Sequence, residues 1–209
     1  MKRIFIPTKG PDDWQQLLAA PVKQWRAGYS AHACAHAWEA ANGLPPEIAK
    51  ALSGNPELLL AIPEHKVALP GRGAASQCDV FALVRTDTGL CTAAIEAKVD
   101  EPFGPTIGEW LRDASPGKRE RLAGLLDILA IDMPPPDIRY QLIHRTAAAL
   151  IEARRFTAPR AAMLVHSFSA TQRWRADYES FADLFPPDST PNGTALTLSW
   201  VAAPLVSSL

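Results

Sequence analysis

The stretches Asp79–Arg85 (DVFALVR) and Cys91–Lys98 (CTAAIEAK) decide the fold. Apolar residues dominate both stretches and a Thr88-Gly89 turn lies between them, a pattern that predicts two antiparallel strands joined as a hairpin. Before them, His65–Leu69 predicts another strand, which ends at the turn-forming residues Pro70–Gly73. The centre of the chain is therefore expected to contain three antiparallel strands.

Helices are expected on either side of this region. The cap-then-proline pair Ser115-Pro116 predicts the start of one helix. The continuous apolar run Ala161–Phe168 is typical of a strand that is buried on both faces. The remaining expected elements are a short strand at Lys2–Ile6, helices at Ala31–Asn42, Pro46–Leu52, Ile138–Phe156 and across Trp174–Phe185, a loop at Val99–Asp113, and a last strand at Ala195–Ala202.

This order of elements predicts an α/β protein with a central mixed β-sheet flanked by helices. We find no internal repeat and no linker, so residues 1–209 are expected to form a single domain. Residues 1–60 are expected to be a helical N-terminal region that packs on the core.

Composition limits the functional classes. Hydrophobic residues make up 47% and charged residues 21% of the 209 residues, as in ordinary globular proteins. The three cysteines form no CxxC pair, so neither a zinc knuckle nor a disulfide framework is expected, and a reducing compartment fits. The N-terminal apolar run is too short for a signal peptide, and no apolar stretch reaches the roughly 20 residues of a membrane span. We therefore expect a cytoplasmic protein that has no membrane partner.

The residues that indicate chemistry lie on the predicted hairpin. Glu96 and Lys98 are two apart on a strand, so their side chains leave the same face of the sheet. The hairpin can bring Asp79 beside them. Two converging carboxylates repel each other unless a divalent cation lies between them, and their oxygen atoms suit Mg²⁺ or Mn²⁺. A lysine next to such a cation would polarise an attacking water or neutralise charge on a phosphoryl group.

Asp79 with Glu96-Ala97-Lys98, on adjacent strands after a helical N-terminal region, resembles the PD-(D/E)XK superfamily of restriction-endonuclease-like nucleases. The resemblance implies a restriction-endonuclease-like fold, with Asp79 and Glu96 as metal ligands and Lys98 as the catalytic lysine. It also implies that Glu39, on the preceding helix, and Gln141, on the helix after the core, join the site. Cys78 stands where the family motif has its proline.

The stretches FIPTKGPDDW (residues 5–14), HAWEAANGLPPE (residues 36–47) and YQLIHRTAAALIEARRF (residues 140–156) also resemble bacterial domains of unknown function.

The leading expectation is a metal-dependent phosphodiesterase or nuclease that hydrolyses nucleic acid. One alternative is a catalytically silent nuclease-fold protein that serves as an interaction or dimerisation module, and a homodimer is compatible with either reading. Another is a hydrolase that acts on a small phosphorylated substrate. A metal at the carboxylates would favour the enzyme, whereas a dry Glu96–Lys98 ion pair and a broad apolar surface would favour the module.

Charge gives only local support for a nucleic-acid partner. The net charge of -1 is not the basic surplus that nucleic-acid-binding proteins usually carry. Basic residues do gather in Arg112–Arg121 and Arg139–Arg160, and they would contact phosphates if they flank Asp79.

Some of the same residues have simpler readings. Glu96 and Lys98 could form a solvated charge pair on the strand face. His32 and His36 have the i, i+4 spacing of some metal sites but lack the intervening glutamate of the zinc-protease motif.

Overall fold

The computed structural model of the protein describes residue 4 and residues 8–204. In chain order the elements are η1 (Pro11–Leu17), α1 (Pro21–Gln24), α2 (Ser30–Ala41), α3 (Pro46–Leu52), β1 (Glu57–Val67), β2 (Ser76–Thr86), β3 (Gly89–Lys98), α4 (Ile107–Leu111), α5 (Pro116–Leu129), α6 (Tyr140–Phe156), β4 (Arg160–Ser167), α7 (Arg175–Ala182), η2 (Pro191–Gly193) and β5 (Ala195–Ala202).

The strands form one five-stranded sheet in the order β1-β2-β3-β4-β5. The pairs β1–β2 and β2–β3 are antiparallel, whereas β3–β4 and β4–β5 are parallel. The expected α/β class, with a central mixed sheet flanked by helices, is therefore confirmed. The segment that contains α4, α5 and the long helix α6 connects β3 to β4, because two parallel strands need a crossover connection.

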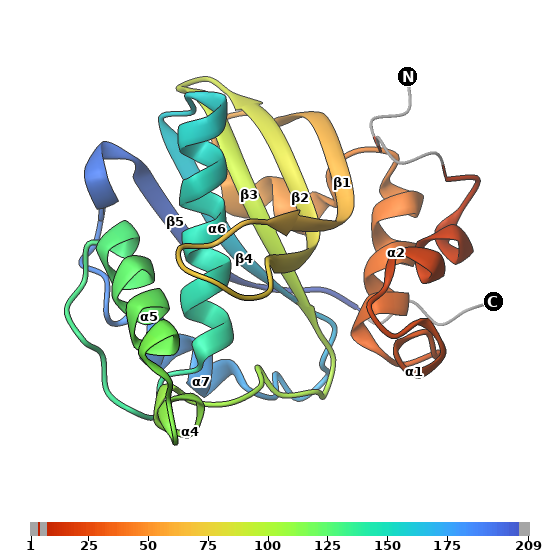
Figure 1. The fold of residues 1–209 in the computed structure, drawn as a ribbon. Coiled ribbons are helices and arrows are strands. Elements are labelled where there is room, and N and C mark those ends of the chain that lie inside the picture. The colour runs from red at the N-terminus through yellow and green to blue at the C-terminus, as the bar shows by residue number, and fades with distance from the viewer. Residues whose placement is uncertain (1–3, 5–7, 205–209) are drawn as a thin grey trace.

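Helices cover both faces of the sheet. Figure 1 shows α6 crossing one face with α5 beside it, while α1 and α2 lie beyond β1, away from α5 and α6. Because side chains alternate along a strand, Ala94 of β3 joins the core beneath α5 and α6, and Ile95 joins the core beneath α2 and α3. The strand β4 lies between β3 and β5 and is buried along Ala161–Ser167, which explains its continuous apolar run.

The strand β1 is longer than the sequence indicated. It runs from Glu57 to Val67, so the expected strand at His65–Leu69 overlaps only its last three residues, and the last residues of the expected helical region 1–60 belong to the sheet. Pro63 obscured the pattern, because proline argues against a central strand; β1 is an edge strand, where proline is tolerated.

The predicted loop at Val99–Asp113 contains the short helix α4. Thr106 accepts a hydrogen bond from the Glu109 amide, and the Glu109 carboxylate accepts one from the Thr106 amide, which forms a capping box. This signal is present in the sequence, but the helix has only five residues and no amphipathic repeat to reveal it. The helix α6 also begins two residues later than expected, at Tyr140.

Of the expected strand at Lys2–Ile6, only Ile4 lies within the described residues. It forms a parallel bridge with Ala61 of β1. In the described part of the chain, no helix has the length and apolar character needed to cross a membrane.

Candidate functional site

The structure brings Asp79, Glu96 and Lys98 together at one pocket between the sheet, α6 and the N-terminal segment. The ladder between β2 and β3 pairs Val80 with Ile95, and Asp79 and Glu96 follow directly beyond this pair. Asp79 Oδ2 accepts a hydrogen bond of 2.6 Å from the Ala97 amide, which fixes the start of β2 against the end of β3.

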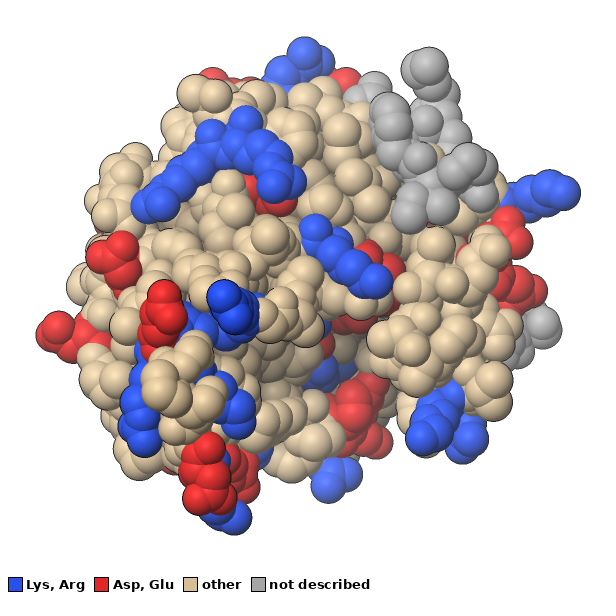
Figure 2. Space-filling model, viewed as in Figure 1, with Lys and Arg blue, Asp and Glu red and all other residues tan. Residues whose placement is uncertain are grey.

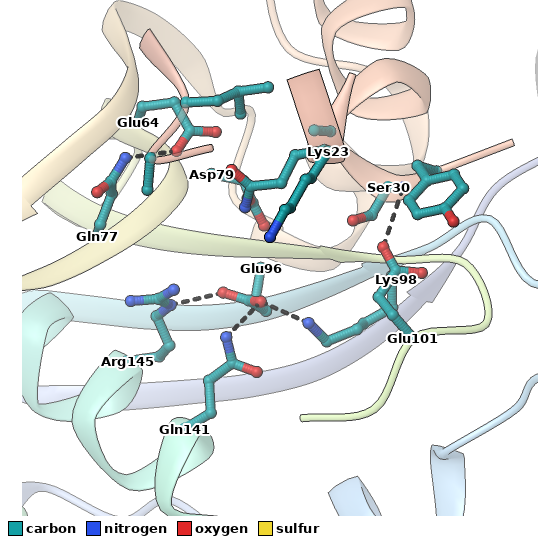
Figure 3. Close-up of a pocket in the computed structure, with 15 residues that line it drawn as sticks. Lys23, Ser30, Glu64, Gln77, Asp79, Glu96, Lys98, Glu101, Gln141 and Arg145 are labelled. Carbon is teal, nitrogen blue, oxygen red and sulfur yellow. Dashed lines mark hydrogen bonds and ion pairs between the residues drawn. The ribbon is translucent and has the colours of Figure 1, made fainter. Parts of the chain in front are cut away.

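These three side chains line a pocket of about 420 Å³, which we call the carboxylate pocket. One wall comes from the N-terminal segment, including Lys23 and Ser30, and the other comes from the sheet and α6 (Figure 3). The protein surface is hollowed between the N-terminal helices and the rest of the domain, and both acidic and basic side chains appear in the hollow (Figure 2). The site is therefore open to solutes and contains charges of both signs.

Glu96 is held by three side chains. Its Oε1 accepts hydrogen bonds from Lys98 Nζ at 2.6 Å and from Gln141 Nε2 at 2.8 Å. Its Oε2 accepts one from Arg145 Nε at 2.5 Å. Burial alone would raise the pKa of Glu96, but the adjacent Arg145 and Lys98 charges outweigh burial and hold it well below its ordinary value. Glu96 is therefore ionised at neutral pH.

The reading of Glu96 and Lys98 as a solvated strand-face pair is wrong. Glu96 is 3% exposed and Lys98 is 4% exposed, because α6 and the segment after β3 cover them. Lys98 Nζ also lies 5.1 Å from the centre of the Phe103 ring. A buried charge pair is costly to build, and this distinguishes it from ordinary surface charges.

Glu64 is an acidic residue of the pocket that sequence analysis did not identify. It lies on β1 across from Asp79: both residues stand between the ladder pairs Pro63–Val80 and His65–Cys78, although they are not themselves a ladder pair. Its φ of 54° is left-handed, which is rare for a non-glycine residue and rarer inside a strand. Gln77 Nε2 donates a hydrogen bond of 2.8 Å to Glu64 Oε2. Backbone strain of this kind is concentrated at functional sites.

Glu64 and Asp79 face each other without the neutralisation that Glu96 receives. Burial, and then the charge of Asp79, raise the pKa of Glu64 to about 9. Burial, and then the charge of Glu96, raise the pKa of Asp79 to about 7, although Lys98 and Arg145 oppose the rise. Such displaced carboxyl pKa values, in a pocket, are typical of functional sites.

The two residues that the family resemblance added have different positions. Gln141, at the start of α6, lines the carboxylate pocket and donates to Glu96. Glu39 is not among the residues that line it; its Oε1 accepts hydrogen bonds from Thr8 Oγ1 at 2.7 Å and Trp14 Nε1 at 2.9 Å. The acidic residues that line the pocket besides Asp79 and Glu96 are Glu64 and Glu101, and not Glu39.

Arg145 was recognised in the sequence only as one of several basic residues. It lies one helical turn after Gln141, so both side chains leave the same face of α6. Its Nη1 donates a hydrogen bond of 2.8 Å to Ser76 Oγ at the start of β2. The i, i+4 spacing from Gln141 is the signal that would have placed it in the site.

The residues present fit a hard divalent cation. Glu64 and Asp79 are two neighbouring oxygen donors whose pKa values are raised, first by burial and then by a nearby carboxylate. Mg²⁺ commonly takes only one or two protein carboxylates and completes its shell with water and substrate phosphates. Among the described residues, no three His, Cys, Asp or Glu side chains form a ready-made metal cage. Any cation bound here would therefore take its remaining ligands from water or from substrate.

Other groups that could carry chemistry lie elsewhere. The rings of His32 and His36 lie 4.3 Å apart on α2, and burial lowers the pKa of His32. Cys34, Cys78 and Cys91 are all free and buried. Burial raises the pKa of all three thiols, so they stay protonated and poorly nucleophilic at neutral pH.

Comparison with known proteins identifies a family and no activity. A search of curated proteins and a search of solved structures each found no match. A family model, described as a domain of unknown function (DUF6946), matches residues 7–205. Because this match covers nearly the whole chain, the protein belongs to the DUF6946 family, whose function is unknown.

Proposed function

We propose that this protein is a metal-dependent nuclease that hydrolyses phosphodiester bonds in the carboxylate pocket. The observation that carries the proposal is the convergence of Asp79, Glu96 and Lys98 with the strained, half-buried Glu64 in one open pocket. The PD-(D/E)XK resemblance supports the same activity, and a mixed five-stranded sheet with helices on both faces is compatible with that superfamily.

Asp79 and Glu96, together with Glu64, are the residues that would hold Mg²⁺ or Mn²⁺. When bound, such an ion polarises a phosphoryl oxygen and lowers the pKa of coordinated water. Asp79 is positioned for this by the Ala97 amide, and Glu96 by Gln141 and Arg145. These contacts orient the carboxylate oxygens before substrate arrives.

Lys98 would act on the phosphoryl group itself. Its ammonium already lies in the pocket beside Glu96. A positive charge held in a partly desolvated site stabilises negative charge that develops on phosphate oxygens, without a cost for reorienting solvent. Gln141 and Arg145 would keep Glu96 in place while Lys98 moves toward substrate.

A catalytically silent module is the second candidate, and the Glu96 network favours it. Lys98 and Arg145 already neutralise Glu96, so the network could be complete in itself. The other feature expected of such a module, a broad apolar surface, is not evident: the exposed large hydrophobic residues among those described are Val22, Tyr29 and Met133.

A cleavage assay tests the proposal directly. The full chain is incubated with single- and double-stranded DNA and RNA in the presence of Mg²⁺ or Mn²⁺, and again with EDTA. We expect metal-dependent cleavage that Asp79→Asn and Glu96→Gln each abolish. Asp183→Asn, which alters an exposed carboxylate at the end of α7, is the matched control and should cleave normally. Absence of cleavage of all four substrates by folded wild type would favour the silent module.

A further inference from the structure

The carboxylate pocket continues into a groove along the start of α6. This groove, of about 430 Å³, shares Lys98, Gln141 and Arg145 with the carboxylate pocket. Its other end shares Tyr140 and His144 with a second pocket, of about 300 Å³. The three hollows therefore lie next to one another along the start of α6, and together they form a depression that leads away from Asp79.

The second pocket is basic, and we call it the basic pocket. Arg72, Lys118 and Arg121 line it, and its lining includes no Asp or Glu among the described residues. Its volume is at the lower end of the range of small-molecule binding sites. Charge thus changes along the depression, from acidic residues at the proposed metal site to basic residues at the far end.

The wall of the basic pocket is held rigidly. Arg121 of α5 is 6% exposed and donates hydrogen bonds to the carbonyl oxygens of Arg72, at 3.1 Å, and Ala74. Arg72 and Ala74 belong to the segment that connects β1 and β2, and this segment also packs closely against α5 at Gly124. A Cβ at Gly124 would lie only 2.7 Å from Pro70 Cβ. A preformed wall lowers the entropy cost of binding.

An aromatic pair forms the floor. The rings of Trp110 and Tyr140 are stacked with centres 4.0 Å apart and an interplanar angle of 13°. Lys118 Nζ lies 5.2 Å from the centre of the Trp110 ring and donates to the Trp110 carbonyl oxygen at 3.1 Å. Lys118 is exposed and can move. A nucleic-acid base could therefore displace the Lys118 ammonium from the Trp110 ring and stack there. The displaced ammonium could then pair with the phosphate of the same nucleotide.

We propose that the basic pocket binds one nucleotide of a single-stranded nucleic acid whose backbone follows the groove to the carboxylate pocket. The base contacts the Trp110–Tyr140 pair, and Arg72 and Lys118 contact the phosphates. A single strand is indicated because a base paired within a duplex would first have to leave the stack to reach an aromatic ring in a pocket. The identity of the occupant rests on the proposed function.

Binding in EDTA tests this inference separately from cleavage. Fluorescence anisotropy measures how the full chain binds short labelled single-stranded DNA, single-stranded RNA and the matching duplex. We expect both single strands to bind more tightly than the duplex. Trp110→Ala and Lys118→Ala should each weaken single-strand binding about tenfold, the scale of losing a stacked base or its accompanying cation. Trp110→Phe retains a ring and should restore most of the affinity.

Lys50→Ala is the matched control, because Lys50 is an exposed lysine on α3 that lines none of the three hollows. Circular dichroism and melting curves establish that each variant is folded. Unchanged binding in the folded Trp110 and Lys118 variants, a preference for duplex, or absence of binding by wild type would each overturn the inference.

Asp79→Asn separates the two proposals. It should bind single strands as wild type does but fail to cleave them. If wild type binds through Trp110 and Lys118 but cleaves nothing, the nuclease proposal fails and the basic pocket stands. If wild type cleaves and the Trp110 and Lys118 variants bind and cleave normally, the basic pocket fails and the nuclease stands.

Discussion

Glu96 is the centre of a buried charged network, because its carboxylate accepts hydrogen bonds from Lys98, Gln141 and Arg145. Removing one partner from a buried charged network leaves the others without compensation, and this penalty is larger than that of breaking a surface pair. Substitutions within this network therefore combine a stability effect with any functional effect. Tests at the scale of single residues must measure both.

Lys98→Met distinguishes an enzyme from a silent network. We expect it to lower the free energy of unfolding by roughly 1–3 kcal/mol, because Glu96 loses a buried charged partner but keeps Arg145. It should leave most metal affinity, which depends on carboxylates, and reduce cleavage by about 10²–10³-fold. Urea unfolding and a cleavage assay measure the two effects.

Lys66→Met is the control for Lys98→Met, because Lys66 is an exposed lysine on β1. It should change neither quantity appreciably. Cleavage by Lys98→Met at the wild-type rate would remove Lys98 from the proposed chemistry.

His144 should make stability depend on acid pH. Burial, and then the positive charge of Arg145, lower the pKa of His144 to about 3, whereas an unfolded histidine titrates near 6.5. Between these values the unfolded chain binds up to one more proton at this residue, so its contribution to stability falls as pH decreases, by up to about 1.4 kcal/mol per pH unit. In His144→Gln, the curve of unfolding free energy against pH should lose this component below about pH 6.5. Parallel curves for wild type and variant would show that His144 is not held neutral.

At the scale of elements, the pair β1–β2 is strained where the site is formed. Glu64 and Asp79 lie opposite each other on these strands, and Glu64 has a left-handed φ of 54°. Ionising two such neighbouring carboxyl groups together is unfavourable, and keeping one of them protonated at neutral pH also costs stability. The remaining strand contacts must offset this cost. A functional role for the carboxylates would account for its presence.

Glu64→Gln should therefore stabilise the fold while impairing metal binding. Keeping this carboxyl protonated above its ordinary pKa costs stability at neutral pH, and an amide has no such cost. We expect a gain of roughly 1–3 kcal/mol in EDTA, with a smaller rise of the melting temperature on addition of Mn²⁺ than in wild type. Differential scanning fluorimetry with and without Mn²⁺ measures both.

Glu57→Gln is the control on the same strand, since Glu57 forms an exposed ion pair with Arg85. It should alter stability by less than about 1 kcal/mol. A loss of stability in Glu64→Gln would mean that the carboxylate is satisfied in the native state.

The helix α6 contributes to every part of the depression. Gln141 and Arg145 reach the carboxylate pocket, while Tyr140 and His144 line the basic pocket. Gln141 and Arg145 are one helical turn apart, and so are Tyr140 and His144. A single rigid helix therefore sets the distance between the proposed reaction site and the proposed nucleotide site.

For the whole molecule, metal binding should couple to global unfolding. A ligand that binds only the native state stabilises it by about 2.7 kcal/mol at 100 times its Kd, and each kcal/mol raises the Tm of a protein of this size by about 2–4 °C. We expect Mn²⁺ to raise the Tm of wild type, and Asp79→Ala or Glu96→Ala to remove this rise. If both variants keep the full shift, the ion binds elsewhere.

The overall charge of -1 conceals how charge is arranged on the surface. Arg72 and Lys118 lie at the basic pocket, and the acidic pair lies at the other end of the groove. Nucleic-acid affinity depends on the cations that contact phosphates, so a slightly acidic protein can still bind a strand locally.

The sequence by itself determined the α/β class, the hairpin and the shared face of Glu96 and Lys98. These features follow from local rules: turn residues between apolar runs predict a hairpin, and the two-residue period of a strand sets which side chains share a face. Gln141 was predicted to be a site residue from the family resemblance.

Only the tertiary structure decided that Glu64 lies opposite Asp79, that Glu39 lies outside the pocket, and that Lys98 and Glu96 are buried. The physical reason is that these features depend on packing between segments distant in sequence. The edge strand β1 contains a proline and pairs with β2 across a long connection, so no local period reveals which of its residues faces Asp79. Burial of Glu96 depends on where α6 lies, and helix docking is set by the sum of many side-chain contacts, which no short sequence pattern specifies.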